Sequence, residues 1–208
     1  MTGWIDLDPH LDVAYLQSID AELEATVREV DREKEVADEV TTFYPSLPPF
    51  RLDKLSLRGN RVRTLYLRKP VGGPASYFNI GSARRTHSTR WWHRFGFLTR
   101  WIEDLPFAEI GRVLVIYDED GHSEDVHRDN PLSRKRPEFI WFRTNLKKRF
   151  FLFDPEREEK DFVTSYCAWF DTRSEYHGYD PVPGTLVHSI RVDGVFEDGF
   201  RRIVFGDG

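Results

Sequence analysis

Residues 149–170 read RFFLFDPEREEKDFVTSYCAWF, and this stretch decides the fold class. It contains two runs rich in aromatic and β-branched residues, Arg149–Asp154 and Phe162–Phe170, on either side of an Asp154-Pro155 turn. Runs of this length and composition predict β-strands, and the Asp-Pro pair predicts the break between them. Because no helical pattern separates the two runs, they favour antiparallel pairing over a β–α–β unit.

The same pattern extends over the C-terminal half of the chain. Four further runs of this type are Arg112–Tyr117, Glu138–Arg143, Thr185–Val192 and Arg201–Phe205. Turn-forming pairs separate the runs, at Asp120-Gly121, Asn130-Pro131, Asp180-Pro181 and Asp193-Gly194. Leu55–Leu67 adds one or two strands nearer the N-terminus. Many short strands at this spacing predict an antiparallel sandwich or barrel of the jelly-roll type.

Two segments carry helical periodicity instead. Within residues 12–40, apolar residues recur at intervals of three and four, at Leu16, Ile19, Leu23, Val27 and Val30. The second predicted helix covers Ser88–Leu105, with Ser88 as its N-cap and Pro106 ending it. We therefore expect a single, mostly β domain over residues 1–208. Residues 1–50 would form a mainly helical layer, and residues 51–208 a jelly-roll core that includes the second helix.

Composition excludes several classes of protein. The 208 residues include 16 Phe, 8 Tyr and 6 Trp, enough for a buried core and incompatible with wholesale disorder. No apolar run approaches the ~20 residues of a membrane span, and the N-terminus lacks the pattern of a signal peptide. Cys167 is the only cysteine and is expected to be a small core residue. We expect a soluble protein of the reducing cytoplasm, with no membrane partner.

Charge is unevenly distributed along the chain. The net charge is −5, yet residues 51–104 contain 12 Lys and Arg residues against three acidic ones. Such a segment can face an anionic ligand, a nucleic acid, or only solvent. Together with Trp91, Trp92 and Trp101 it raises one alternative function, a non-catalytic β-sandwich that binds nucleic acid by stacking and charge. The negative net charge and the helical spacing of the tryptophans argue against a nucleic-acid partner.

Two short motifs have a spacing that suits a metal ion, His122-Ser-Glu124 and His127-Arg-Asp129. Residues i and i+2 of a strand point to the same side, so an imidazole and a carboxylate placed in this way can hold one ion. A histidine from a distant strand would complete the two-histidine, one-carboxylate set that binds ferrous iron and leaves three positions open. His122 and Glu124 could be the metal pair, with His127 structural, although the Asp-Gly turn puts His122 near a loop tip.

The residues that follow the second motif resemble the iron(II)- and 2-oxoglutarate-dependent oxygenases in their order. After His127-Arg-Asp129 comes the segment Trp169-Phe-Asp-Thr-Arg-Ser-Glu-Tyr-His177, and Arg191 follows 14 residues later in a strand-like run. An acidic Phe-Asp segment that leads into a Glu-x-His element is most similar to the aspartyl/asparaginyl β-hydroxylase-like group. Two features depart from that group: the spacing to Arg191 is long, and Val192-Asp-Gly-Val-Phe replaces a Trp-His-Pro element.

This resemblance implies a double-stranded β-helix (jelly-roll, cupin-like) core and a dioxygenase activity. It makes His127, Asp129 and His177 the iron ligands and catalytic residues. Arg191 would bind the distal carboxylate of 2-oxoglutarate, and Arg143 is a candidate for a second carboxylate contact. The implied cofactors are Fe(II) and 2-oxoglutarate. The implied reaction uses molecular oxygen to hydroxylate or desaturate a C–H bond of an amino-acid-like small molecule or peptide, while 2-oxoglutarate is decarboxylated to succinate.

Two further alternatives remain open in the sequence. His188 could replace His177, with Arg201 or Arg202 as the partner of 2-oxoglutarate. Because His188 and Arg191 are three residues apart, they would face opposite sides of one strand, and only one of them could line the barrel. The other alternative is a cupin-type metal enzyme that does not use 2-oxoglutarate.

Overall fold

The computed structural model describes residues 3–35, 63–71, 86–121, 124–129 and 135–206. In these ranges the strands are β1 (Trp4–Asp6), β2 (Arg63–Pro70), β3 (Thr86–Ser88), β4 (Phe107–Asp118), β5 (Glu124–His127), β6 (Phe139–Phe142), β7 (Arg149–Asp154), β8 (Glu159–Phe162), β9 (Cys167–Phe170), β10 (Tyr176–Asp180) and β11 (Val187–Phe196). The helices are η1 (Asp8–His10), α1 (Val13–Ser18), α2 (Asp20–Glu35), α3 (Gly96–Glu103) and α4 (Asp198–Phe205). None of these described helices is both long enough and apolar enough to cross a bilayer.

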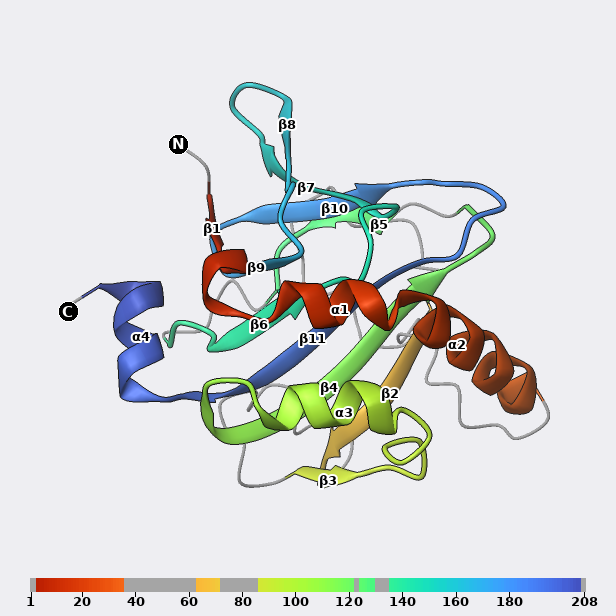
Figure 1. Cartoon of the computed structure of the whole chain (residues 1–208). Helices are drawn as coiled ribbons and strands as arrows, with labels where there is room; N and C mark the ends of the chain where they lie inside the picture. Colours follow the sequence, from red (N-terminus) through yellow and green to blue (C-terminus); the bar gives the residue numbers. More distant parts are fainter. Residues whose placement is uncertain (1–2, 36–62, 72–85, 122–123, 130–134, 207–208) are drawn as a thin grey trace.

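The strands form two antiparallel sheets (Figure 1). The large sheet has the order β1-β9-β6-β11-β4-β2-β3, and the small sheet has the order β5-β10-β7-β8. From β4 onward, consecutive strands cross from one sheet to the other, except at the β7–β8 hairpin. Residues distant in sequence therefore become neighbours. The antiparallel β-sandwich of jelly-roll type predicted from the turn-separated runs is confirmed.

The outer face of the large sheet is covered by α1, α2 and α3 (Figure 1). Tyr15 of α1 donates its hydroxyl to the Phe97 carbonyl at 2.8 Å, and the Trp101 ring lies 4.8 Å from the ring of Phe142 on β6. The apolar stripe predicted within residues 12–40 is buried against this face, at Leu16, Ile19, Leu23, Val27 and Val30. The helical prediction is thus confirmed up to Glu35, except that the segment is divided at Ile19 into α1 and α2. Residues 36–40 lie outside the described ranges.

An aromatic core fills the space between the two sheets. The ring of Trp141 on β6 lies 4.6 Å from that of Phe150 on β7, and Phe150 lies 5.3 Å from Phe170 on β9. Phe139 contacts Phe170 edge-on at 5.3 Å. Because side chains alternate along a strand, Phe142 of β6 points the other way, toward α3. This alternation gives the large sheet a second core beneath the helices.

The second helix is shorter than predicted. It begins at Gly96, and Ser88, the predicted N-cap, instead ends β3. The hydroxyl of Thr89 donates to the Tyr66 carbonyl at 2.7 Å and accepts from the Trp91 N–H at 3.2 Å. These two hydrogen bonds attach the turns that follow β3 to β2. Trp91 is therefore buried, but it belongs to a segment of turns before Gly96 and not to a helix. The predicted helix Ser88–Leu105 is corrected to Gly96–Glu103.

Segments near both ends of the chain also differ from the sequence predictions. The predicted strand-like run Arg201–Phe205 belongs to α4, because Phe200 and Val204, one turn apart, bury the same helix face. Gly206 ends this helix with φ of +77°. Near the N-terminus, β1 pairs with β9 through the register Ile5↔Trp169, so Trp4–Asp6 extend the large sheet. Of the predicted strand Leu55–Leu67, residues 63–67 lie in β2, and the rest lies outside the described ranges.

Candidate metal centre

The pairing of β5 with β10 places two histidines opposite each other. His127 and His177 are direct partners in this antiparallel pair, so their side chains leave the same face of the small sheet. Their ring centroids are 4.4 Å apart. Both histidines were predicted from the sequence, and the strand pairing brings them together.

Asp129 completes the group, two residues after His127. Its Oδ1 atom lies 3.6 Å from Nε2 of His127. His127, Asp129 and His177 each offer one ligand atom, and these three atoms lie within 4.8 Å of one another. His177 is buried, whereas the side chains of His127 and Asp129 retain 23% and 33% exposure. Two imidazoles and one carboxylate at this separation suit a divalent transition metal ion.

The orientation of His177 favours metal binding. Its Nδ1 atom lies 3.1 Å from the carbonyl oxygen of Glu175. A carbonyl can only accept, so Nδ1 carries the proton and the lone pair is on Nε2. The ring is fixed between Phe150 and Phe170, with centroid distances of 5.9 and 5.3 Å. A hydrogen bond that sets the tautomer of an imidazole is the usual support for a metal-ligating histidine.

Arg191 reaches the same site from β11 and contacts the carboxylate of Asp129. Its Nη1 donates to Asp129 Oδ2 at 2.7 Å, and its Nε donates to Asp193 Oδ1 at 2.9 Å. Asp193 in turn accepts from Nε of Arg112 at 2.7 Å through its other oxygen. The guanidinium of Arg191 also lies 4.2 Å from the centre of the Phe139 ring. We call Arg112, Asp193, Arg191 and Asp129 the charge chain.

His127 and Arg191 together keep Asp129 ionised. Burial raises the pKa of this carboxyl group, but the interaction with His127 and the positive charge of Arg191 outweigh burial. The pKa of Asp129 therefore lies well below its usual range. An ionised carboxylate beside two imidazoles is the form that binds a metal cation.

Arg143 is the other arginine predicted to bind 2-oxoglutarate, and its guanidinium donates hydrogen bonds to main-chain carbonyl groups. Its Nε and Nη2 donate to the Ser165 carbonyl at 3.2 and 3.1 Å, and its Nη1 donates to the Lys148 carbonyl at 2.6 Å. Burial lowers the pKa of Arg143 to about 10. These contacts tie the β6–β7 connection to the segment that precedes β9. The prediction that Arg143 contacts a carboxylate of 2-oxoglutarate has no support in them.

His188, the alternative third ligand, points away from the two metal-site histidines. It is fully buried on the helix-facing side of β11, where its Nε2 lies 2.6 Å from the Thr144 hydroxyl. Thr144 donates its own proton to Asp20 of α2, so His188 Nε2 is the donor to Thr144. Burial lowers the pKa of His188 to about 4. The alternative in which His188 replaces His177 beside His127 is therefore wrong.

His188 belongs to a second polar group, with Asp20 and Glu24 of α2. The carboxylates of this group already accept hydrogen bonds: Asn145 donates to Asp20 at 2.6 Å, and Lys147 donates to Glu24 at 2.5 Å. Cationic and neutral donors around both carboxylates indicate a structural clamp that fixes α2 to the sheet.

The other predicted candidates take different positions. His122 lies outside the described residues. Arg201, on α4, pairs with Glu138 and Asp198. Trp91, Trp92 and Trp101 are each at most 8% exposed, which removes them as stacking platforms for a nucleic acid. Cys167 is fully buried, as predicted for a core residue.

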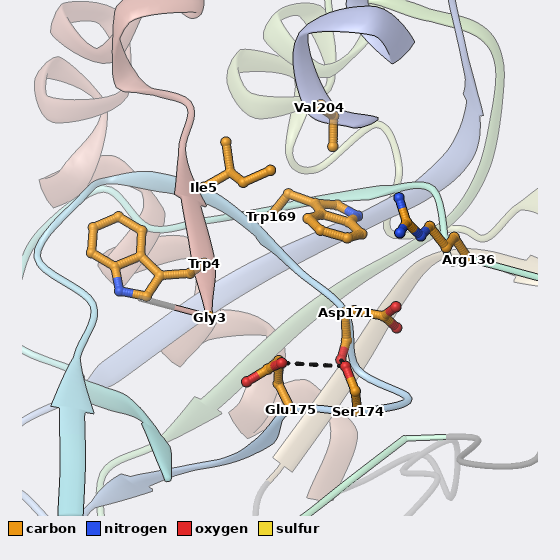
Figure 2. A pocket seen from close by; sticks show the side chains of 9 residues that line it. All are labelled: Gly3, Trp4, Ile5, Arg136, Trp169, Asp171, Ser174, Glu175 and Val204. Carbon is orange, nitrogen blue, oxygen red and sulfur yellow. Dashed lines mark hydrogen bonds between the residues drawn. The ribbon is translucent and has the colours of Figure 1, made fainter. Parts of the chain in front are cut away.

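A cavity of about 340 Å³ lies next to the loop that leads into β10 (Figure 2). Figure 2 shows Trp169 between Ile5 and Arg136, with Val204 above and the acidic residues of the loop below. Its lining consists of Gly3, Trp4, Ile5, Arg136, Trp169, Asp171, Ser174, Glu175 and Val204. None of the three candidate ligands lines this cavity, so it is distinct from the metal centre.

Comparison with known proteins gives a likeness in fold. No protein-family profile and no curated protein sequence matches the chain. Among solved structures, the chain is similar to a prolyl hydroxylase from Trichoplax adhaerens in complex with a hypoxia-inducible factor oxygen degradation domain peptide fragment. The TM-score is 0.50 at 13% identity, over 89% of this chain and 81% of that one. At this identity the likeness concerns the fold alone.

Two other solved structures belong to the same class of protein. A prolyl-4-hydroxylase from Pseudomonas putida matches with a TM-score of 0.47 at 14% identity, over 95% of this chain and 94% of that one. A 2OG-Fe(II) oxygenase family oxidoreductase from Burkholderia pseudomallei matches with 0.42 at 11% identity, over 64% and 67%. These structural neighbours are thus 2-oxoglutarate–iron(II) oxygenases, and grouping the chain with aspartyl/asparaginyl β-hydroxylases stays a prediction.

Proposed function

We propose that this protein is an iron(II)- and 2-oxoglutarate-dependent oxygenase that hydroxylates or desaturates a C–H bond of an amino-acid-like small molecule or a peptide. One observation carries the proposal: His127, Asp129 and His177, from two adjacent strands, bring three ligand atoms within 4.8 Å of one another. Two imidazoles and a carboxylate on one side of a ferrous ion leave its other positions for a co-substrate and oxygen.

The strand order supports this proposal. Within the large sheet the inner strands run β9-β6-β11-β4, and the small sheet runs β5-β10-β7-β8. Apart from the β7–β8 hairpin, these eight strands alternate between the two sheets along the chain. This order supports the assignment of the core as a double-stranded β-helix. Among the candidate ligands, His127 ends β5, Asp129 lies two residues later, and His177 lies on β10, so all three are at one end of the small sheet. We infer that this end is the mouth of the barrel.

Each residue of the site has a separate task. When bound, Fe(II) with 2-oxoglutarate and O2 supplies the oxidation of a C–H bond, coupled to loss of CO2 and formation of succinate. His127 and His177 supply neutral nitrogen donors, and Asp129 supplies a negative charge held by Arg191. The aromatic wall of Phe150 and Phe170 behind His177 keeps water from the inner side of the centre.

The amino-acid or peptide nature of the substrate rests on resemblance. The solved prolyl hydroxylase with a bound peptide fragment shares the fold, which is compatible with a peptide substrate. We also infer a cytoplasmic setting, because the only cysteine of the chain is fully buried and needs no oxidising compartment.

Succinate release tests the proposal. The purified protein would be incubated with Fe(II), 2-oxoglutarate, O2 and panels of amino acids and short peptides, and succinate would be measured. We expect succinate with at least one panel member and none with His127→Ala or Asp129→Ala, whereas His10→Ala, at an exposed position, should behave like wild type. Metal binding without any use of 2-oxoglutarate would favour the cupin-type alternative, and salt-dependent oligonucleotide binding alone would favour the non-catalytic one.

A further inference from the structure

A buried lysine lies inside the sandwich, one side-chain layer away from the candidate metal centre. Lys148, immediately before β7, is 2% exposed. Its Nζ donates to the hydroxyl of Ser189 on β11 at 2.8 Å and lies 4.4 Å from the centre of the Tyr179 ring on β10. Burial of an ammonium group is costly, so a lysine in such a place normally serves a purpose.

The strands fix the position of Lys148 relative to the metal centre. Tyr179 is two residues after His177 on β10, and Ser189 is two residues before Arg191 on β11. Residues i and i+2 share a face and are about 6.8 Å apart along a strand. Both contacts of Lys148 therefore lie one layer beyond His177 and Arg191, on the faces that carry those residues.

From these positions, and resting on the proposed function, we infer that Lys148 with Ser189 binds the distal carboxylate of 2-oxoglutarate. The carboxyl groups of 2-oxoglutarate are separated by a keto carbon and two methylenes, a span close to one side-chain layer, roughly 7 Å. An ammonium and a hydroxyl side by side are donors that a carboxylate accepts. Arg143 supports this site through the main chain, because its Nη1 donates to the Lys148 carbonyl at 2.6 Å.

Arg191 then has a different task from the one predicted from sequence. Its Nη1 holds Oδ2 of Asp129 and its Nε holds Asp193, and both contacts are shorter than 3 Å. With Oδ2 occupied in this way, Oδ1 is the oxygen of Asp129 that lies on the side of His127. Arg191 is thus a positioning residue that presents one oxygen of Asp129 to the metal.

The two roles can be separated with two keto acids. 2-Oxobutyrate has the chelating keto-carboxylate end of 2-oxoglutarate but lacks the distal carboxylate. Anaerobic titrations of the Fe(II)-loaded protein with each acid, followed by calorimetry and by the visible absorption band, give both dissociation constants. Fe(II) affinity is measured separately, without any keto acid.

We expect wild type to prefer 2-oxoglutarate by at least 30-fold. Lys148→Met should reduce that preference to less than 3-fold and leave Fe(II) affinity unchanged, and Ser189→Ala should reduce it several-fold. Lys147→Met, the neighbouring lysine that pairs with Glu24 outside the sandwich, is the matched control and should behave like wild type. Arg191→Met should weaken Fe(II) binding at least 10-fold and keep the preference for 2-oxoglutarate.

The opposite pattern would overturn the inference. If Lys148→Met and Ser189→Ala both kept the wild-type preference while Arg191→Met lost it, Arg191 would be the anchor, as the sequence predicted. Thermal denaturation of each variant distinguishes the loss of one contact from the loss of the fold. If Lys148→Met does not fold, the preference for 2-oxoglutarate measured with Ser189→Ala still tests the inference. If wild type bound Fe(II) but neither keto acid, the proposed function itself would be contradicted, and this inference with it.

Discussion

Asp193 Oδ1 accepts a hydrogen bond at 2.9 Å from Nε of Arg191, two residues earlier on the same strand. Neighbours at i and i+2 share a face of a strand, so the sequence Arg-Val-Asp builds an ion pair within β11 itself. The second oxygen of Asp193 binds Arg112 of β4 at 2.7 Å. One buried carboxylate thereby ties two strands of the large sheet to the arginine that holds Asp129.

Asp193→Asn should destabilise the fold strongly. The carboxylate is 2% exposed, and its loss leaves the charges of Arg112 and Arg191 without their shared counter-ion. Removal of one member of a buried ion pair costs about 3–5 kcal/mol. Urea denaturation measures the change. Asp198→Asn, which breaks the exposed pair with Arg201, is the control and should change the free energy of unfolding little. Equal stability of the two variants would contradict this account of the charge chain.

His188 should make the stability fall in mild acid. Burial lowers its pKa in the folded protein to about 4, below the ordinary value of 6.5, so the unfolded chain binds this proton first. Its contribution is intact above about pH 6.5 and is lost as the pH falls toward 4, by up to about 3 kcal/mol. Urea denaturation between pH 4.5 and 7.5 should show a steeper acid loss for wild type than for His188→Gln.

The exposed His10 provides the control for that comparison, since His10→Gln should leave the slope of wild type unchanged. Four charged groups act on His188: Asp20, Lys148, Lys147 and Arg143. Parallel pH profiles for wild type and His188→Gln would show that the buried imidazole does not cause the acid loss.

Two glycines should respond in opposite directions to alanine. A Cβ at Gly194 of β11 would lie 2.5 Å from the carbonyl oxygen of Glu109 and 2.5 Å from the Phe107 ring, so the paired strands would have to shift. Overpacking of this kind costs about 1–3 kcal/mol. Gly199 of α4 has nothing within 4 Å of its added Cβ, and its replacement should stabilise by about 0.4–1 kcal/mol. Thermal melting of both variants checks the pair, and stabilisation by Gly194→Ala would be the contrary result.

Much of the β core was predictable because its strands are bounded by turn chemistry that acts locally. The runs Arg112–Tyr117 and Arg149–Asp154 lie in strands as expected. The prediction of a strand at Arg201–Phe205 is wrong, because its apolar residues do not alternate and burial of Phe200 and Val204 on one face makes the segment helical. No predicted run covers β10, although His177 is expected to lie on a distant strand: Tyr176–Asp180 contains no β-branched residue, and its pairing with β5 and β7 is a long-range effect.

The site residues likewise fall into those that the sequence predicted and those that it did not. His127, Asp129 and His177 were identified from their order in the chain, although only the β5–β10 register shows that the rings meet. The burial of Lys148 could not be predicted from the sequence, because a lysine within Lys-Lys-Arg is normally exposed to solvent. The sequence predicts a turn at Asp193-Gly194, whereas β11 continues through both residues to Phe196. Burial of charged groups depends on tertiary packing and is invisible to local patterns.

The most direct test of the metal centre is the visible charge-transfer band of the anaerobic protein with Fe(II) and 2-oxoglutarate. The account predicts this band in wild type and in His188→Ala, whose imidazole lies on the helix-facing side of β11. It predicts loss of the band in His127→Ala, Asp129→Ala and His177→Ala, with their thermal stability retained. A band that persists in folded His177→Ala, or its absence from wild type at saturating Fe(II) and 2-oxoglutarate, would contradict it.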